Sequence, residues 1–397
     1  MKKTLLLTLG LAMILIACKK KKTDDPSEAL FKLDYTTQTV EQQKQTIEKE
    51  GVDFLNSLNS LPNEKFVKVM SHLKDLNPSI NSGALNSVYS VSAAAKTKSI
   101  KGIFIASTTN SETVKLSDSY GIFTWNFAKK DWDEKPSTTK LEIIFPSDEG
   151  KTSNNCLYTM TAVAATVKTS EGDELPASVS ASLKVDNKEE LKLTSDYAYK
   201  ANGTPTKADI NIIMGGYSFI TKIENDGSKL TSSFSFLKST ETLIALNTAV
   251  NGNLNFDVQD EETIVNNANA TFEVMNIKLA GIVDIAAIQK ANSSINEATD
   301  SLENVRQSEI WNKHSKFVAI NKKENLVMAR VEFVPVSRND CYTYWNGQAD
   351  VEECDKDYNI DPRLIFKDNS KLSFDAFIDN GFSELRKELE DFTKKFD

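Results

Sequence analysis

The chain has 397 residues, with 47 Lys and Arg against 56 Asp and Glu and a hydrophobic share of 40%. This composition is typical of a globular protein and excludes disorder of the whole chain. It contains two histidines and five arginines, and all five arginines lie between Arg306 and Arg386. The negative balance and the late, sparse arginines argue against nucleic-acid binding.

Residues 1–17 are predicted to be a signal peptide. Lys2 and Lys3 precede an apolar run that is shorter than the ~20 residues of a membrane span and ends in Leu15-Ile16-Ala17-Cys18. That ending resembles the lipobox of bacterial lipoproteins. The resemblance implies diacylation of Cys18, cleavage before it and N-acylation of the new terminus. Several acyl chains would anchor the protein durably, because each buried CH₂ contributes ~0.8 kcal/mol.

Residues 18–36 are expected to form a lipidated tether. Cleavage leaves 45 basic against 56 acidic residues, a net charge of −11, and Lys19 to Lys22 can lie against anionic head groups. No Asp follows Cys18 directly, so the inner-membrane retention signal of bacterial lipoproteins is missing and the outer membrane is favoured. The basic run followed by Asp24-Asp25 is similar to export signals on surface lipoproteins of the Bacteroidetes. A solvated polar tether explains the same run, so the periplasmic or surface face stays open.

Residues 37–80 are predicted to form a helical hairpin. Apolar residues recur at helical spacing in two segments, Pro62 opens the second, and Asn77-Pro78 ends it. The two apolar stripes are Val40, Ile47, Phe54, Leu58 and Leu61, then Phe66, Val69, Met70, Leu73 and Leu76.

Residues 81–275 are predicted to form an antiparallel β region. Apolar and polar residues alternate there, as in 179–185 and 208–214, which places the apolar groups on one strand face. Short turn signals between the runs favour a meander: Asn202-Gly203, Gly215-Gly216, Asp226-Gly227 and Asn251-Gly252.

Residues 276–397 are expected to be continuous with the same body. The pattern predicts a long helix near 276–312, a β-hairpin over 317–334, a cysteine-bearing loop and a C-terminal amphipathic helix. One-sided helices and a sheet with one apolar face can bury each other. The predicted fold class is therefore α+β: a curved antiparallel β-meander sheet with the N-terminal αα-hairpin, the long helix and the C-terminal helix packed on it.

A disulfide is expected between Cys341 and Cys354. A protein beyond the inner membrane meets oxidising conditions, and these two cysteines flank a 12-residue polar loop. Closing a loop of that size contributes ~3 kcal/mol in the chain-entropy model. Cys156 would then be a free, buried thiol.

No metal, cofactor or catalytic activity is expected. The cysteines lack CxxC spacing, and His72 and His314 have no recognisable partner motif. The run from Asp355 to Asp361 begins like an EF-hand calcium loop. However, Ile360 stands where the turn needs Gly, and Phe366 where a bidentate Glu is needed.

Tyr342, Tyr344 and Trp345 lie inside the expected cysteine loop and form the candidate ligand-binding set. Tyr and Trp are favoured at binding hot spots and stack on sugar rings. The alternative is that these rings cap the core beneath the loop.

The sequence therefore predicts a non-enzymatic lipoprotein of the outer membrane with a binding or assembly role. Its partner would be an envelope protein, or an apolar ligand such as a lipid held between sheet and helices. The second option is similar in architecture to periplasmic lipoprotein carriers, although no motif supports it. The alternative function is a surface glycan-binding lipoprotein that uses Tyr342, Tyr344 and Trp345.

Overall fold

The computed structural model describes residues 26–76, 89, 90, 92, 93, 120–168, 172, 174–254, 264–296, 299–345, 347–379, 381–385 and 387. The predicted signal peptide, Cys18 and residues 19–25 of the tether lie outside this part. So do residues 388–397, which hold most of the predicted C-terminal helix. Within the part described, no helix is both long and apolar enough to cross a membrane.

Most of the described chain is β-structure. Sixteen strands form one mixed sheet in the hydrogen-bonded order β16-β15-β14-β13-β12-β11-β10-β9-β8-β7-β6-β5-β4-β3-β1-β2. The α+β class is thus confirmed in a form that is mostly β. The strands are β1 Gly121–Asn126, β2 Asp131–Lys135, β3 Leu141–Phe145, β4 Cys156–Lys168, β5 Glu174–Val185, β6 Lys188–Tyr199, β7 Pro205–Met214, β8 Tyr217–Asn225, β9 Lys229–Lys238, β10 Glu241–Asn253, β11 Ile264–Val274, β12 Ile277–Val283, β13 Ser315–Asn321, β14 Leu326–Trp345, β15 Asp350–Ile365 and β16 Lys371–Ser373.

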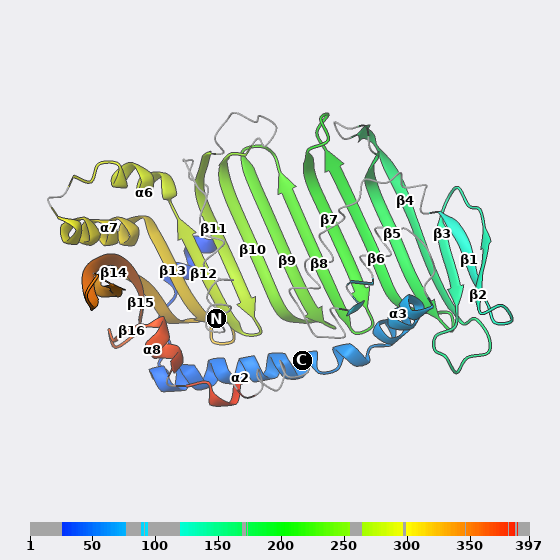
Figure 1. The fold of residues 1–397 in the computed structure, drawn as a ribbon, viewed down its shortest axis with the longest axis horizontal. Helices are drawn as coiled ribbons and strands as arrows, with labels where there is room; N and C mark the ends of the chain where they lie inside the picture. Colours follow the sequence, from blue (N-terminus) through cyan, green and yellow to red (C-terminus); the bar gives the residue numbers. More distant parts are fainter. Residues whose placement is uncertain are drawn as a thin grey trace. The chain divides into compact units, whose positions relative to one another are not determined.

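Helices occur at both ends of the described chain and between β12 and β13 (Figure 1). Two helices lie within the predicted 37–80 segment, as expected. The helical elements are η1 Pro26–Lys32, α2 Val40–Leu58, η2 Leu61–Asn63, α3 Lys65–Asp75, α6 Ile285–Asn292, α7 Asp300–His314 and α8 Phe374–Asp379.

The chain divides into two compact units. Unit 1 comprises residues 1–49, 248–254 and 262–383, and unit 2 comprises residues 50–247, 255–261 and 384–397. Unit 2 contains β1 to β9 and α3, whereas unit 1 contains η1, β11 to β16 and α6 to α8. Helix α2 and strand β10 contribute to both.

In unit 2, tight turns join successive antiparallel strands as predicted. Asn202-Gly203, Gly215-Gly216 and Asp226-Gly227 each lie in a turn between paired strands. The predicted turn at Asn251-Gly252 is wrong, because these residues belong to β10. The purely antiparallel sheet is also corrected, since β1 pairs parallel with β3 and antiparallel with β2.

The core of unit 2 is built on an aromatic stack. Phe236 is fully buried and stacks on Phe219 and Tyr217, with ring centroids 4.3 and 5.7 Å away. These three residues share one sheet face because Phe219 pairs with Phe236 across β8 and β9. The Tyr217 hydroxyl donates to the Ser57 carbonyl at 2.5 Å. Through this hydrogen bond, Tyr217 joins the sheet to the last turn of α2.

In unit 1, the long helix predicted near 276–312 is wrong over its first part. Residues 277–283 form β12, which pairs with β11 and β13. Gly281 favours the strand over the helix because glycine is a poor helix former. In the sheet, the Phe317 ring of β13 fills the space that a side chain at position 281 would occupy. A Cβ at Gly281 would lie 2.7 Å from Phe317 Cδ1. Helix begins only after Asp284, whose carboxylate accepts the Ala287 N–H at 3.1 Å.

The last part of the predicted tether is folded onto unit 1. Leu30, Phe31, Leu33 and Tyr35 pack against a buried cluster of Ala280, Val318, Ile320 and Val327. The Arg330 guanidinium donates to the carbonyls of Phe31 and Leu33 at 2.7 and 2.8 Å and lies over the Tyr35 ring. Any free tether therefore ends before Leu30.

Candidate functional site

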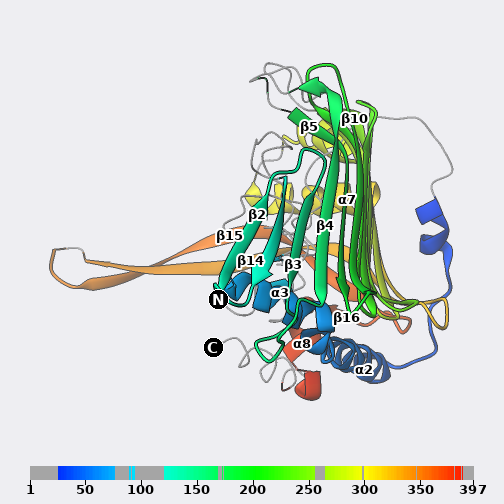
Figure 2. The same ribbon diagram turned by 90° about the vertical axis from the view of Figure 1, so that its right-hand side faces the viewer.

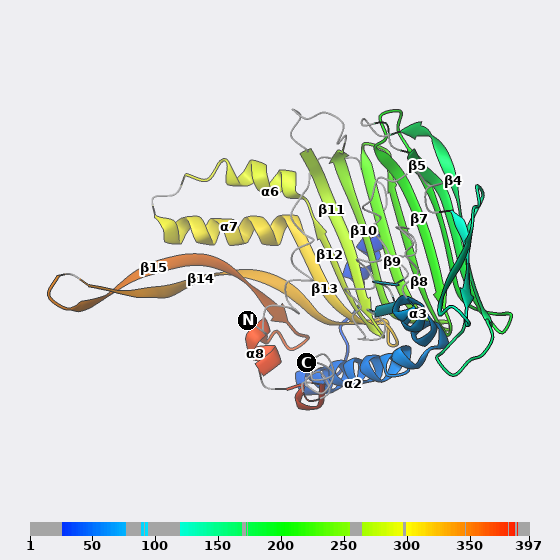
Figure 3. The same ribbon diagram turned by 45° about the vertical axis from the view of Figure 1, so that its right-hand side comes forward.

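Strands β14 and β15 form a long two-stranded ribbon that extends from unit 1 (Figures 2 and 3). Their register runs without a shift from Arg330↔Ile365 to Trp345↔Asp350. Strand β13 pairs with β14 only as far as Arg330, and β16 pairs with β15 from Arg363. Residues 334–361 are therefore paired with each other alone, and we call them the arm.

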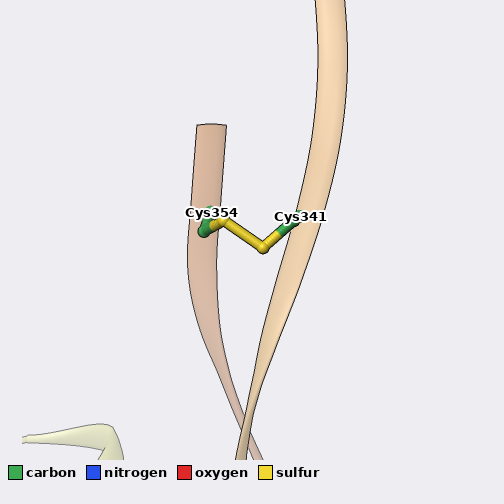
Figure 4. Close-up of a disulfide and its surroundings, with 2 residues drawn as sticks. All are labelled: Cys341 and Cys354. Atoms are coloured by element: carbon green, nitrogen blue, oxygen red, sulfur yellow. A yellow bond between two sulfur atoms is a disulfide. The ribbon is translucent and has the colours of Figure 1, made fainter. Parts of the chain in front are cut away.

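The polar loop predicted between the cysteines is wrong, because both cysteines lie in strands. Cys341 and Cys354 stand directly opposite each other and form the predicted disulfide, with an S–S distance of 2.07 Å and a Cα–Cα distance of 4.0 Å (Figure 4). Residues 342–345 combine aromatic and β-branched side chains, which favour strands. The disulfide thus links two paired strands of the arm rather than the ends of an unpaired loop.

Helix α7 covers the edge of β14 where the arm begins. The Asn312 side chain accepts the Phe333 N–H and donates to the Phe333 carbonyl, both at 2.7 Å. Both backbone groups of Phe333 therefore point away from β15. Asn312 satisfies an exposed strand edge that would otherwise offer itself for pairing with another chain.

The same geometry explains where the disulfide and the prolines sit. Because the backbone groups of Phe333 point away from β15, Phe333 and Pro362 form a non-hydrogen-bonded pair. Pro362 has no N–H, and at this position none is needed for the hydrogen bonds between β14 and β15. In an antiparallel ladder the two kinds of pair alternate, so Cys341–Cys354 is of the same kind. Such pairs bring the Cα atoms closest, which agrees with the short distance between the two cysteines.

Replacing Asn312 with alanine is expected to destabilise the base of the arm by about 1 kcal/mol, because two net hydrogen bonds are exchanged for water. The amide of Phe333 should exchange with solvent faster, which hydrogen exchange measures. Lys313→Ala is the matched control, since Lys313 is an exposed neighbour in the same helix. Equal protection of Phe333 in both variants would contradict the edge-covering role.

The arm has two different faces. Opposed residues share a face, so Tyr342 and Tyr344 lie together with Val351 and Glu353. We call this the tyrosine face. The two tyrosine rings lie 6.1 Å apart between centroids. Trp345 lies on the opposite face, which also carries the disulfide.

The three aromatic side chains are exposed at the end of the arm. Tyr342, Tyr344 and Trp345 are 47%, 43% and 64% exposed. They do not cap a core, and the alternative of buried rings is wrong. The structure brings Tyr342 and Tyr344 together on one face and places Trp345 on the other, all within a few residues of the disulfide.

The arm is strongly acidic. Residues 334–361 contain seven Asp and Glu against one Arg and one Lys. Asp361 is paired with Arg363 at 2.9 Å and lies 3.9 Å from Arg338. The pKa of the Tyr342 hydroxyl is raised above its ordinary value. The main cause is local desolvation, followed by a hydrogen bond to Glu353 and the negative charges of Glu353 and Asp355.

The described residues offer little for metal binding at this site. Cys341, Glu352 and Cys354 bring three potential ligand atoms within 4.8 Å of one another, but both sulfurs are used in the disulfide. The calcium-like run from Asp355 to Asp361 is part of β15, so its side chains alternate between two faces instead of converging.

The remaining reactive residues lie elsewhere. Cys156 is a free and buried thiol, as predicted, and burial raises its pKa to about 12. This makes Cys156 a structural residue rather than a nucleophile. His72 lies in α3 of unit 2, and His314 ends α7 of unit 1.

Comparison of the chain with protein-family models, curated proteins and solved structures found no match. Function is therefore inferred from the arm itself. The sequence indicated the aromatic residues and the disulfide of the arm but not its strands. Between Asp355 and Asp361, every second residue is Asp or Asn, and this period of two was the signal that could have revealed β15. Asn312 carried no sequence signal, because its partner is a backbone 21 residues away.

Proposed function

We propose that this protein is a non-enzymatic lipoprotein of the outer membrane that binds a partner protein of the cell envelope through its arm. The observation that supports this best is the exposure of Tyr342, Tyr344 and Trp345 at the end of a disulfide-linked ribbon. Exposed large aromatics are favoured as binding anchors, because they bury a large area when a partner docks.

The disulfide supports the same proposal. It holds the two strands of the arm in register next to the aromatic residues, four positions from Trp345. A preorganised binding element loses less conformational entropy on association. The arm is therefore suited to present its rings to a partner rather than to fold around one.

Glycan binding is the second candidate function, and the Tyr342–Tyr344 pair is the observation that favours it. Two exposed rings on one face can stack on successive sugars. Trp345 lies on the other face and would not contribute to the same platform. This division favours a protein partner that contacts both sides of the ribbon.

Membrane attachment is proposed to depend on Cys18. In the native host, Cys18→Ala is expected to move the protein from the membrane fraction to the soluble fraction and to abolish incorporation of labelled palmitate, because the acyl chains are lost. Fractionation and labelling measure both. Retention of the variant in the outer membrane would contradict the lipid anchor.

The binding role is tested by isolating the full lipoprotein from its own outer membrane after mild cross-linking and identifying the proteins and glycans that accompany it. The variant Tyr342→Ala/Tyr344→Ala/Trp345→Ala is expected to lose the specific partner by about tenfold or more, since hot-spot aromatics each contribute ~2 kcal/mol. The matched control is Val163→Ala/Ile213→Ala/Leu279→Ala, which removes three exposed apolar side chains elsewhere. Equal recovery of the partner by both variants would contradict the proposal.

A further inference from the structure

The tyrosine face joins aromatic rings to carboxylates in one strip. Asp340 pairs with Asp355 across the ladder, and Tyr342 pairs with Glu353 next to them. All three acidic side chains are exposed. Among the residues that the structure describes, no ion pair joins Asp340, Glu353 or Asp355 to a basic side chain.

The Asp340–Asp355 pair is unfavourable for the arm itself. Like charges directly opposite each other destabilise an antiparallel ladder. At the base of the arm the charge is compensated, because Arg363 and Arg338 lie beside Asp361. The uncompensated negative charge lies where the rings begin.

We infer that the tyrosine face binds a Lys- or Arg-rich segment of the partner protein, with cationic groups over the rings of Tyr342 and Tyr344 and ion-paired to Glu353, Asp340 and Asp355. This inference rests on the proposed binding role of the arm. A cationic side chain satisfies both features at once, since its stem packs on an aromatic ring while its charge meets the ring face and the carboxylates.

The chain uses the same contact elsewhere. Arg330 lies 5.1 Å from the centroid of Tyr35, and Lys238 lies 5.7 Å from that of Tyr217. At both places the cation belongs to the chain. On the arm the rings and the carboxylates are present, and the partner supplies the cation.

Charge also argues against other occupants of this face. A second copy would bring the same carboxylates against it, and like-charge contacts across an interface are costly. Anionic lipid surfaces and nucleic acids are repelled for the same reason. A cationic protein segment is the occupant that the charges favour.

The test uses the intact lipoprotein in detergent and a fluorescein-labelled nona-arginine peptide as the probe, with binding followed by fluorescence anisotropy. Asp340→Asn/Glu353→Gln/Asp355→Asn is expected to weaken binding about tenfold, and Tyr342→Ala/Tyr344→Ala about fivefold. The matched control is Glu149→Gln/Glu189→Gln/Glu241→Gln, which removes three exposed acids from unit 2 and should change binding less than about twofold.

Two results would overturn the inference. One is that the arm-acid variant and the control-acid variant weaken peptide binding equally, which would show that the peptide responds to net charge alone. The other is no effect of the tyrosine substitutions. Recovery of the native partner separates this inference from the proposed function. If the tyrosine variant loses the partner and the acid variant keeps it, binding by the arm stands and cationic recognition fails. If both variants keep the partner, cationic recognition by the tyrosine face fails, and if the Tyr342→Ala/Tyr344→Ala/Trp345→Ala variant keeps it as well, the proposed function itself fails.

Discussion

Replacing Phe236 with alanine is expected to lower the free energy of unfolding of unit 2 by about 4 kcal/mol, because large-to-small substitutions of buried aromatics lose burial energy and leave a cavity. Phe236 is fully buried and is the residue that contacts both Tyr217 and Phe219 in the stack. Its loss would leave two rings without their shared neighbour.

Denaturant unfolding followed by hydrogen exchange of peptides from β8 and β9 measures this loss. Ser235→Ala is the matched control, since Ser235 precedes Phe236 in β9 and points to the opposite sheet face. It should cost less than about 1 kcal/mol. Similar losses for the two variants would show that the aromatic stack does not form the core of unit 2.

Replacing both Cys341 and Cys354 with serine is expected to destabilise the arm by about 3 kcal/mol, because the cross-link no longer restricts its unfolded state. Faster hydrogen exchange should follow in peptides from β14 and β15 beyond Phe333, where no other strand pairs with the ribbon. Partner binding should weaken with it, since the rings would lose their preorganised support.

Two comparisons control this experiment. A reducing agent should loosen the arm of the native protein and leave the double variant unchanged, because Cys156 is buried and makes no disulfide. Exchange in unit 2 should not change. Unaltered exchange of the arm in the double variant would mean that strand pairing alone holds it.

Hydrophobic periodicity predicted the elements whose side chains face a core. Residues 179–185 and 208–214 alternate as strands with one apolar face, and β5 and β7 contain them. Gly215-Gly216 and Asp226-Gly227 predicted turns because the backbone there needs positive φ, which Gly215 and Gly227 adopt. The pairing of Cys341 with Cys354 followed from their spacing.

Other features depended on neighbours that a local pattern does not contain. The segment 277–283 has apolar residues that fit either a helix or a strand, and its pairing with β11 and β13 decides for the strand. The outer part of the arm has no apolar alternation, because every residue of β14 from Ser337 to Trp345 is exposed, on both faces. Its acids were visible in the sequence, but their place beside Tyr342 depends on the register of the ribbon.

Site-specific photo-cross-linking in living cells tests the binding role of the arm most directly. A benzophenone amino acid replaces Trp345 in one strain and Ile213, an exposed residue of unit 2, in another. We expect a discrete protein adduct from position 345 and no such adduct from position 213. Absence of any adduct at position 345, or the same adducts from both positions, would contradict a partner-binding arm.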